Sequence, residues 1–175
     1  MKCISLWEPW ASLMYVGAKK NETRSWPTKH RGPLLICAAQ HVMNAGSMRY
    51  YLEQPAFMKA LQPLTRGEDR QVSISDLNFG KALCIVDVVD CLSIGVFAEL
   101  FVSDQEAAFG NYDFGRFAWV TTNLQRFEEP FKIKGGQRIF NTPNELIERH
   151  LPFECLSEWA DSAGVEFSVT TGQTL

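Results

Sequence analysis

The stretch from residue 81 to residue 92 constrains the fold of this chain more than any other part of the sequence. It reads Lys-Ala-Leu-Cys-Ile-Val-Asp-Val-Val-Asp-Cys-Leu, and neither glycine nor proline interrupts it. Val and Ile are β-branched and favour extended backbone, so this stretch predicts the strongest β-strand of the chain. Apolar stretches at 3–7, 33–39 and 115–127 predict further strands.

Short helices are expected between these strands. Residues 10–16 have helical apolar spacing after Pro9, and Gly17 is expected to end that helix in a left-handed conformation. Further along the chain we expect a helix over 44–61 that is interrupted near Pro55, a short helix around 95–102, a helix over 143–150 that begins with a Thr142–Glu145 capping box, and a helix near 154–162. Between and after them we expect a polar loop over 104–114, a turn between extended pieces over 130–141, and an extended piece from Val165 to Val169.

This order of elements predicts one α+β domain. Five or so strands with interspersed short helices indicate a small barrel with flanking helices. The length of 175 residues fits one domain of ordinary size, which we place at residues 1–150. Residues 62–80 are polar and punctuated by Pro63, Gly67 and Gly80, so they are expected to be a loop insertion, and residues 151–175 a C-terminal extension.

Composition excludes several classes of protein. Hydrophobic residues make up 46% and charged residues 21% of the chain, which excludes disordered, collagen-like and mucin-like chains. No stretch approaches about 18 apolar residues, and Glu8 and Pro9 lie where a signal peptide needs its apolar run. We therefore expect an intracellular, cytoplasmic protein that does not bind membranes.

The cysteines and histidines do not have the spacing of a metal site. There are five cysteines, no two of them in a CxxC pattern, and they lie mostly among apolar residues, so we expect buried reduced thiols. The three histidines, at positions 30, 41 and 150, are also without metal-ligand spacing. His30 could contact phosphate or face solvent, and His41 could line a cleft or be structural. No metal or cofactor is expected.

Charge is distributed unevenly along the chain. The net charge is −3, but residues 1–49 carry a balance of +5 and residues 50–175 a balance of −8. A basic segment on an acidic body favours one local patch that meets a few phosphates and excludes a surface that coats nucleic acid all over. The acidic half leaves open a protein partner.

The segment after Gly17 contains the most informative polar residues. If residues 22–26 are extended, Glu22, Arg24 and Trp26 point to one side of the strand, with Lys19 just before them. Arg and Lys bind phosphate, a carboxylate accepts from the exocyclic amine of a base, and an indole stacks on it. These side chains could therefore hold a nucleotide. Alternatively, Glu22 and Arg24 form a structural ion pair and Trp26 covers the core.

Several separated motifs resemble the ASCH domain, the activating signal cointegrator homology family of the PUA-like group. They are Pro9-Trp10-Ala11, the Gly-x-Lys-x-x-Glu-x-Arg pattern at Gly17, Lys19, Glu22 and Arg24, then Ser25-Trp26, Arg31-Gly32, the strand around Val86–Leu92, the aromatic strand Gly115–Trp119 and the segment Lys134–Phe140. The resemblance covers residues 3–141 in the order of the family and is greatest to the version found in the transcription coactivator.

The resemblance implies a PUA-like barrel of five to six strands with a cleft beside the Gly17–Arg24 motif. It also implies binding of RNA or DNA in that cleft. Of these we expect RNA, which could be single-stranded, and a nucleotide is the other ligand that we expect. The residues expected to bind it are Lys19, Lys20, Glu22, Arg24, Ser25, Trp26, Lys29, Arg31, Arg116 and Lys134.

An enzymatic alternative follows from the same resemblance. Some small members hydrolyse acetylated cytidine with a lysine, a threonine three residues later and a distant glutamate. Here Lys19 matches the lysine, but Glu22 occupies the position of the threonine, so the hydroxyl nucleophile of that scheme is missing. The alternative function is a metal-independent hydrolase of RNA or a modified nucleoside, with Lys19 and Glu22 as catalytic candidates.

Overall fold

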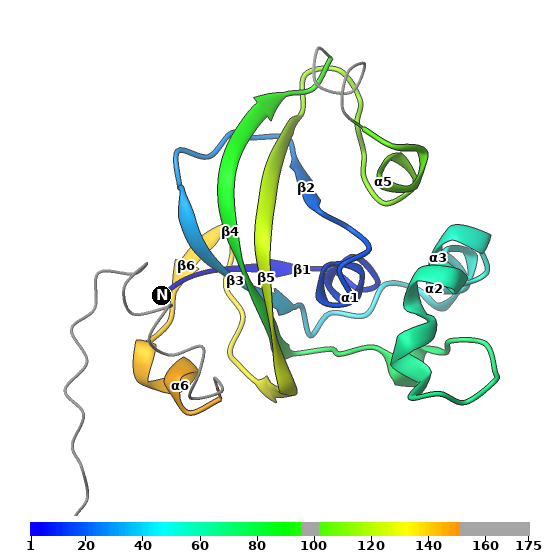
Figure 1. Cartoon of the computed structure of the whole chain (residues 1–175). Coiled ribbons are helices and arrows are strands. Elements are labelled where there is room, and N and C mark those ends of the chain that lie inside the picture. Colours follow the sequence, from blue (N-terminus) through cyan, green and yellow to red (C-terminus); the bar gives the residue numbers. More distant parts are fainter. Residues whose placement is uncertain (96–101, 151–175) are drawn as a thin grey trace, which may run out of the picture.

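The computed structural model describes residues 1–95 and 102–150 and contains one curled six-stranded sheet (Figure 1). The strands lie in the order β2-β5-β4-β3-β1-β6. Strands β1 and β3 are parallel, and every other neighbouring pair is antiparallel. The bounds are β1 Lys2–Leu6, β2 Asn21–Arg24, β3 Gly32–Ala38, β4 Lys81–Ser93, β5 Phe117–Lys132 and β6 Ile139–Asn141. The predicted α+β fold with a barrel-like sheet is confirmed.

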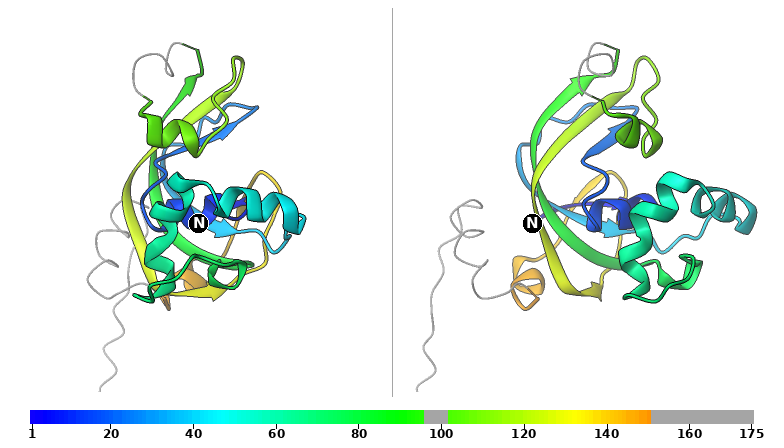
Figure 2. Two further views of the ribbon diagram at one scale, coloured as in Figure 1. Left: turned by 90° about the vertical axis from the view of Figure 1, so that its right-hand side faces the viewer. Right: turned by 45° about the vertical axis from the view of Figure 1, so that its right-hand side comes forward.

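Short helices flank this sheet, and α1, α2 and α3 lie together on one side of it (Figure 2). Gly17 follows α1 with a φ of 81°, which confirms the predicted left-handed end of that helix. The bounds are α1 Trp10–Tyr15, α2 Ala45–Leu52, α3 Pro55–Leu61, α5 Asp104–Ala108 and α6 Asn144–Glu148, with 3₁₀ turns η1 Gln62–Thr65 and η2 Ile74–Asp76.

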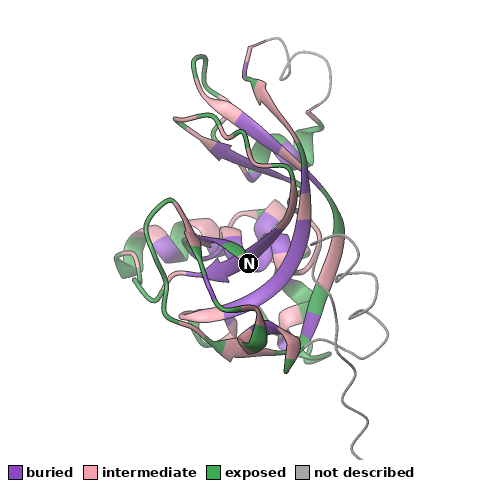
Figure 3. Cartoon of the chain, turned by 90° about the vertical axis from the view of Figure 1, so that its left-hand side faces the viewer, coloured by how far each residue is buried: buried purple, intermediate pink, exposed green. Residues whose placement is uncertain are grey.

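The two longest strands give the sheet its curvature. β4 and β5 pair over most of their lengths, and their register shifts at three places, between Ala82 and Cys84, Ile85 and Asp87, and Val88 and Asp90. Each shift adds local bend and twist, so the pair curves instead of lying flat. Buried segments, purple in Figure 3, run along these central strands. The indole of Trp119 on β5 is fully buried in the core beneath α1.

A second apolar cluster attaches the helices to α1. Leu13 of α1 packs with Met48 of α2, Phe57 of α3 and Phe109, which follows α5, and all four side chains are buried. This cluster holds α2 at a fixed place beside α1 although the two helices are far apart in sequence. The interruption of the predicted helix over 44–61 near Pro55 is confirmed, since α2 ends at Leu52 and α3 begins at Pro55.

A buried carboxylate fixes the chain where β1 turns into α1. Glu8 is 1% exposed and accepts hydrogen bonds from the Ser12 amide at 3.0 Å, the Ser12 hydroxyl at 2.8 Å and the Asn78 amide at 2.9 Å. Burial raises the pKa of the Glu8 carboxyl, and these three donors act in the opposite direction. The residues on either side of Glu8 are therefore held by its side chain as well as by the sheet.

Two local predictions were wrong. Residues 104–108 form α5 rather than a loop, because the Ser103 side chain accepts from the Glu106 amide at 3.2 Å and caps a helix. The predicted capping box at Thr142 is not formed, because α6 begins at Asn144 and no side chain caps it; Asn144 Oδ1 instead accepts from the N-terminal ammonium at 2.6 Å.

Several other predictions fall outside the described residues, namely most of the helix around 95–102, the helix near 154–162 and the extended piece at 165–169.

Within 1–95 and 102–150, no helix is long and apolar enough to cross a membrane. The same residues contain no group of three His, Cys, Asp or Glu side chains arranged to hold a metal ion. Their cysteines are free thiols, three of them buried.

Candidate functional site

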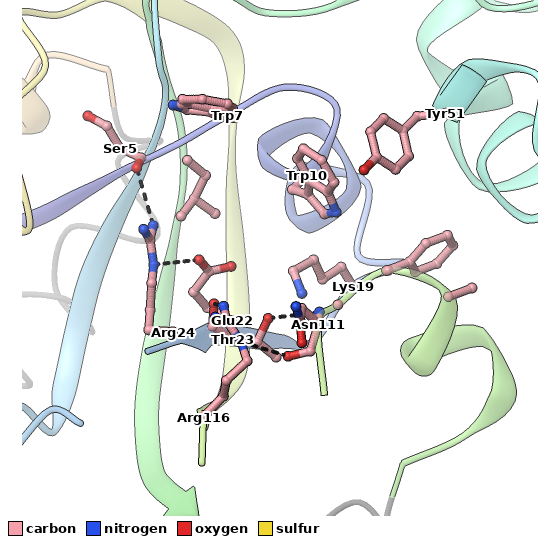
Figure 4. Close-up of a pocket in the computed structure, with 14 residues that line it drawn as sticks. Ser5, Trp7, Trp10, Lys19, Glu22, Thr23, Arg24, Tyr51, Asn111 and Arg116 are labelled. Atoms are coloured by element: carbon pink, nitrogen blue, oxygen red, sulfur yellow. Dashed lines mark hydrogen bonds and ion pairs between the residues drawn. The ribbon is translucent and has the colours of Figure 1, made fainter. Parts of the chain in front are cut away.

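A pocket of about 450 Å³ opens between β2, the β1–α1 turn and the segment after α5. Polar and charged side chains form one part of its lining and aromatic side chains another (Figure 4). Its residues are Ser5, Leu6, Trp7, Trp10, Lys19, Glu22, Thr23, Arg24, Tyr51, Ala108, Phe109, Gly110, Asn111 and Arg116. Three of them are cations and one is an acid.

Glu22 and Arg24 lie together on β2, as the alternation of a strand requires. The Arg24 Nε is 2.7 Å from Glu22 Oε1, and Arg24 Nη2 donates to the Ser5 carbonyl at 3.4 Å. Strand β2 is an edge strand paired only with β5 in the described residues, with Glu22 opposite Trp119. The ion pair is therefore both a structural contact and part of the pocket lining.

Lys19 is a buried lysine at the same pocket. Its side chain is 1% exposed, its Nζ donates to the Asn21 carbonyl, and Glu106 Oε1 lies 3.9 Å from it. Burial lowers the pKa of the Lys19 ammonium, while the charges of Glu22 and Glu106 oppose that shift. Lys19 is thus an amine that gives up its proton more readily than an ordinary lysine.

Glu106 of α5 organises the backbone in front of β2. Its carboxylate accepts from the amides of Lys20 and Asn21, each at 2.9 Å, and from the Tyr112 hydroxyl at 3.2 Å. It is 7% exposed. These contacts fix the chain between Lys19 and Glu22, so a helix more than 80 residues away along the chain positions the motif.

Arg116 is held at the pocket by carbonyl oxygens. Its Nε donates to the Asn111 carbonyl at 3.2 Å and its Nη2 to the Thr23 carbonyl at 3.3 Å. The Asn111 amide in turn donates to the Thr23 hydroxyl at 3.2 Å. Within the described residues the guanidinium therefore contacts neutral oxygens, and its charge is available to a ligand.

The aromatic part of the lining comes from three separate elements. The rings of Trp10 and Tyr51 pack edge to face, 4.8 Å apart, between α1 and α2. Trp7 lies just after β1 and is 53% exposed. Figure 4 shows these three rings across from Glu22 and Arg24. The pocket thus offers aromatic surface on one side and charged groups on the other.

Six of the predicted site residues do not line this pocket: Lys20, Ser25, Trp26, Lys29, Arg31 and Lys134. β2 ends at Arg24, so the extended stretch expected over residues 22–26 stops short of Trp26. Trp26 packs edge to face on Trp119 at 4.7 Å, as in the alternative interpretation in which it covers the core. Arg31 pairs with Asp90 at 2.8 Å, outside the pocket.

Sequence reasoning missed several lining residues, chiefly Tyr51, Asn111 and Thr23. No local sequence pattern predicts that Tyr51 lies at this pocket. Helical spacing indicates which face of a helix Tyr51 is on, but it does not indicate which other segment that face contacts. Glu106, which supports the motif, was missed although Ser103 and Glu106 have capping-box spacing that predicts a helix there. Trp7, two residues before Pro9, was also missed.

Comparison with known proteins gives one family. The ASCH domain model matches residues 4–131. Activating signal cointegrator 1 of Mus musculus is 32% identical to this chain over 144 residues, and the protein of the same name from Homo sapiens is 31% identical over 144 residues. Each match covers 82% of this chain and 22% of the relative. The chain therefore spans about a fifth of the length of these relatives. The crystal structure of ASCH from Zymomonas mobilis aligns with a TM-score of 0.48 and 12% identity, covering 85% of this chain and 91% of that one.

Proposed function

The chain belongs to the ASCH domain family, and from that premise we propose that it binds single-stranded nucleic acid by taking one nucleotide into the pocket at β2. RNA is the preferred ligand, as the family resemblance implies. A nucleotide can enter such a pocket only when its base is unstacked from its neighbours, which single strands allow at low cost.

The charge of the pocket is the observation that supports this proposal most strongly. The whole chain has a net charge of −3, yet Lys19, Arg24 and Arg116 line the pocket. Glu22 pairs with Arg24 and Glu106 lies 3.9 Å from Lys19, so Arg116 is the cation of the lining that has no acidic partner within the described residues. A concave, positively charged site on an acidic protein attracts an anion to one place. Guanidinium groups match the oxygens of phosphate with paired hydrogen bonds, so Arg24 and Arg116 are assigned to phosphate.

The remaining lining fits the other parts of a nucleotide. Trp10 and Tyr51 supply aromatic surface for the face of a base. Glu22 accepts hydrogen bonds and is assigned to an exocyclic amino group of the base. A volume of about 450 Å³ lies in the range of ordinary small-molecule sites, which is about 300–1,000 Å³.

Salt dependence tests this assignment. If Arg24 and Arg116 each neutralise a phosphate of a single strand, the logarithm of the association constant should fall with the logarithm of salt concentration at a slope of about −1.4. The measurement is fluorescence anisotropy of a labelled single-stranded RNA, titrated with the protein at several salt concentrations. Binding that does not respond to salt, or no binding to RNA or DNA at any salt concentration, contradicts the proposal.

A metal-independent hydrolase is the second candidate, and the state of Lys19 favours it. Burial lowers the pKa of its ammonium, which makes Lys19 a better proton donor to a leaving nitrogen. In hydrolysis of acetylated cytidine, Glu22 would take a proton from water as the water oxygen adds to the acetyl carbon. The C–N bond then breaks, and Lys19 protonates the departing amine, which leaves cytidine and acetate.

Turnover decides whether this second function exists. Purified protein with acetylated cytidine and a metal chelator should release cytidine, detected by chromatography, and the variants Lys19→Ala and Glu22→Gln should each lower the rate at least about 100-fold. The variant Arg31→Ala, which alters a cation outside the pocket, should leave the rate unchanged. Absence of product with the unmodified protein removes the hydrolase and leaves the binding proposal in place.

A further inference from the structure

We propose that Trp7 and His41 form a stacking platform for the base next to the nucleotide held in the pocket. This inference rests on the proposed function and adds to it the minimal ligand, which is a strand of at least two consecutive nucleotides. The platform lies at the edge of the pocket, where the chain leaves β1 and where the segment after β3 passes beside it.

Trp7 is held in an exposed position by a rigid backbone. Its neighbours Leu6 and Glu8 are 2% and 1% exposed, so the chain on both sides is buried while the indole faces outward. The Trp7 carbonyl accepts from the Ala11 amide at 3.1 Å, and the Leu6 carbonyl accepts from the Ala39 amide at 2.7 Å. The outward indole is therefore a fixed feature and does not result from a loose loop.

The exposure of Trp7 is unusual among the tryptophans that the structure describes. Trp119 is fully buried, and Trp10 and Trp26 are partly buried against other rings. Trp7 is 53% exposed, and its ring partner is the exposed imidazole of His41, with centroids 5.2 Å apart and planes inclined by 46°. The two rings make an aromatic surface that the fold itself leaves uncovered, which is what a stacking ligand requires.

The platform is continuous with the pocket. Trp7 itself lines the pocket (Figure 4), so a base on its outer part would neighbour one inside. Arg24 lies on the same side, because its Nη2 donates to the carbonyl of Ser5, two residues before Trp7. A phosphate that links the two nucleotides would meet this guanidinium.

The surroundings of the platform favour a base over an apolar partner. Gln40, on one side of His41, is exposed and polar, and Val42, on the other side, is apolar and 48% exposed. His41 itself has ring nitrogens that can donate or accept. A nucleobase has an aromatic face with a polar edge, and this combination fits it.

Comparison of ligand lengths tests the platform. Affinities of the full chain are measured by competition against a labelled single-stranded RNA 10-mer, using a nucleoside monophosphate, the matching dinucleotide and the unlabelled 10-mer, and again with DNA. We expect the dinucleotide to bind about 5- to 100-fold more tightly than the mononucleotide, which is the range that stacking of one base on an aromatic side chain contributes. Trp7→Ala should remove most of this advantage.

Variants and controls separate the possible outcomes. Trp7→Phe, which keeps a ring, should restore most of the advantage, and His41→Ala, a change on an exposed residue, should reduce it. Phe114→Ala removes another exposed aromatic ring, 93% exposed and outside the pocket lining, and should have no effect. If mononucleotide and dinucleotide bind equally in the unmodified protein, or if Trp7→Ala and His41→Ala keep the advantage, the platform is overturned while the pocket proposal stands. Absence of binding to every ligand overturns the pocket proposal itself.

Discussion

Replacing Arg24 by alanine is expected to weaken the binding of single-stranded nucleic acid by about 10- to 100-fold. A hydrogen bond to a charged group contributes about 1.5–3 kcal/mol, and about 1.4 kcal/mol corresponds to a tenfold change in Kd. The loss has a second source. Without its partner at 2.7 Å, the Glu22 carboxylate loses its nearest cation and would repel a phosphate bound beside it.

Two comparison variants make this result specific. Arg24→Lys keeps the charge but loses the planar pair of donors, so its Kd should lie between those of the unmodified protein and of Arg24→Ala. Arg31→Ala removes a cation of the same basic segment that pairs with Asp90 outside the pocket, and it should change Kd by less than about threefold. Kd is measured by anisotropy at one fixed salt concentration, with circular dichroism to check folding. Equal losses in Arg24→Ala and Arg31→Ala would place the binding surface elsewhere.

Glu106→Ala is expected to lower the free energy of unfolding by about 3–5 kcal/mol, the usual cost of removing one partner of a buried charged group. Three donors lose their acceptor, namely the amides of Lys20 and Asn21 and the hydroxyl of Tyr112. Lys19, with a side chain only 1% exposed, also loses a carboxylate 3.9 Å away. For a chain of this size the melting temperature should fall by roughly 10 °C.

The matched control lies on the same helix. Asp104 is also an acidic residue of α5 but is exposed, so Asp104→Ala should change the melting temperature by no more than about 2 °C. Glu106→Gln keeps an oxygen acceptor and should fall between the two. Thermal and urea unfolding, followed by circular dichroism, measure these differences. If Glu106→Ala is as stable as Asp104→Ala, α5 does not support the chain before β2.

The elements of the sheet could be predicted because each depends on local pattern. The apolar run at 81–92 and the stretches at 3–7 and 33–39 all form strands within one or two residues of the expected bounds. Local sequence pattern predicted the ends of helices less well than it predicted the strands. A capping box was expected at Thr142, and none was expected at Ser103. In the structure the Ser103 side chain caps α5, whereas no side chain caps α6 after Thr142.

The candidate site was predictable only within the motif itself. Strand alternation places Glu22 and Arg24 on one side of β2, and the structure has them paired. The same rule does not extend to Trp26, because the strand ends at Arg24 and the indole packs against Trp119 on β5, outside the pocket lining. Where a strand ends depends on its partner strand, and the partner lies almost a hundred residues further along the chain.

The sequence by itself determined most of the stretches that are extended or helical, although not α5, and it determined where the chain turns at Gly17 and which charged side chains share the face of β2. Periodicity and glycine conformation act over a few residues, so a short segment is enough to reveal them. Only the tertiary structure decided that Tyr51 and Trp10 lie across from that face and that Glu106 lies behind Lys19. Those placements result from the packing of Leu13, Met48, Phe57 and Phe109 and from the bends in β4 and β5. Apolar packing can bring any two compatible faces together, so a pattern within one segment does not reveal which distant segment covers it.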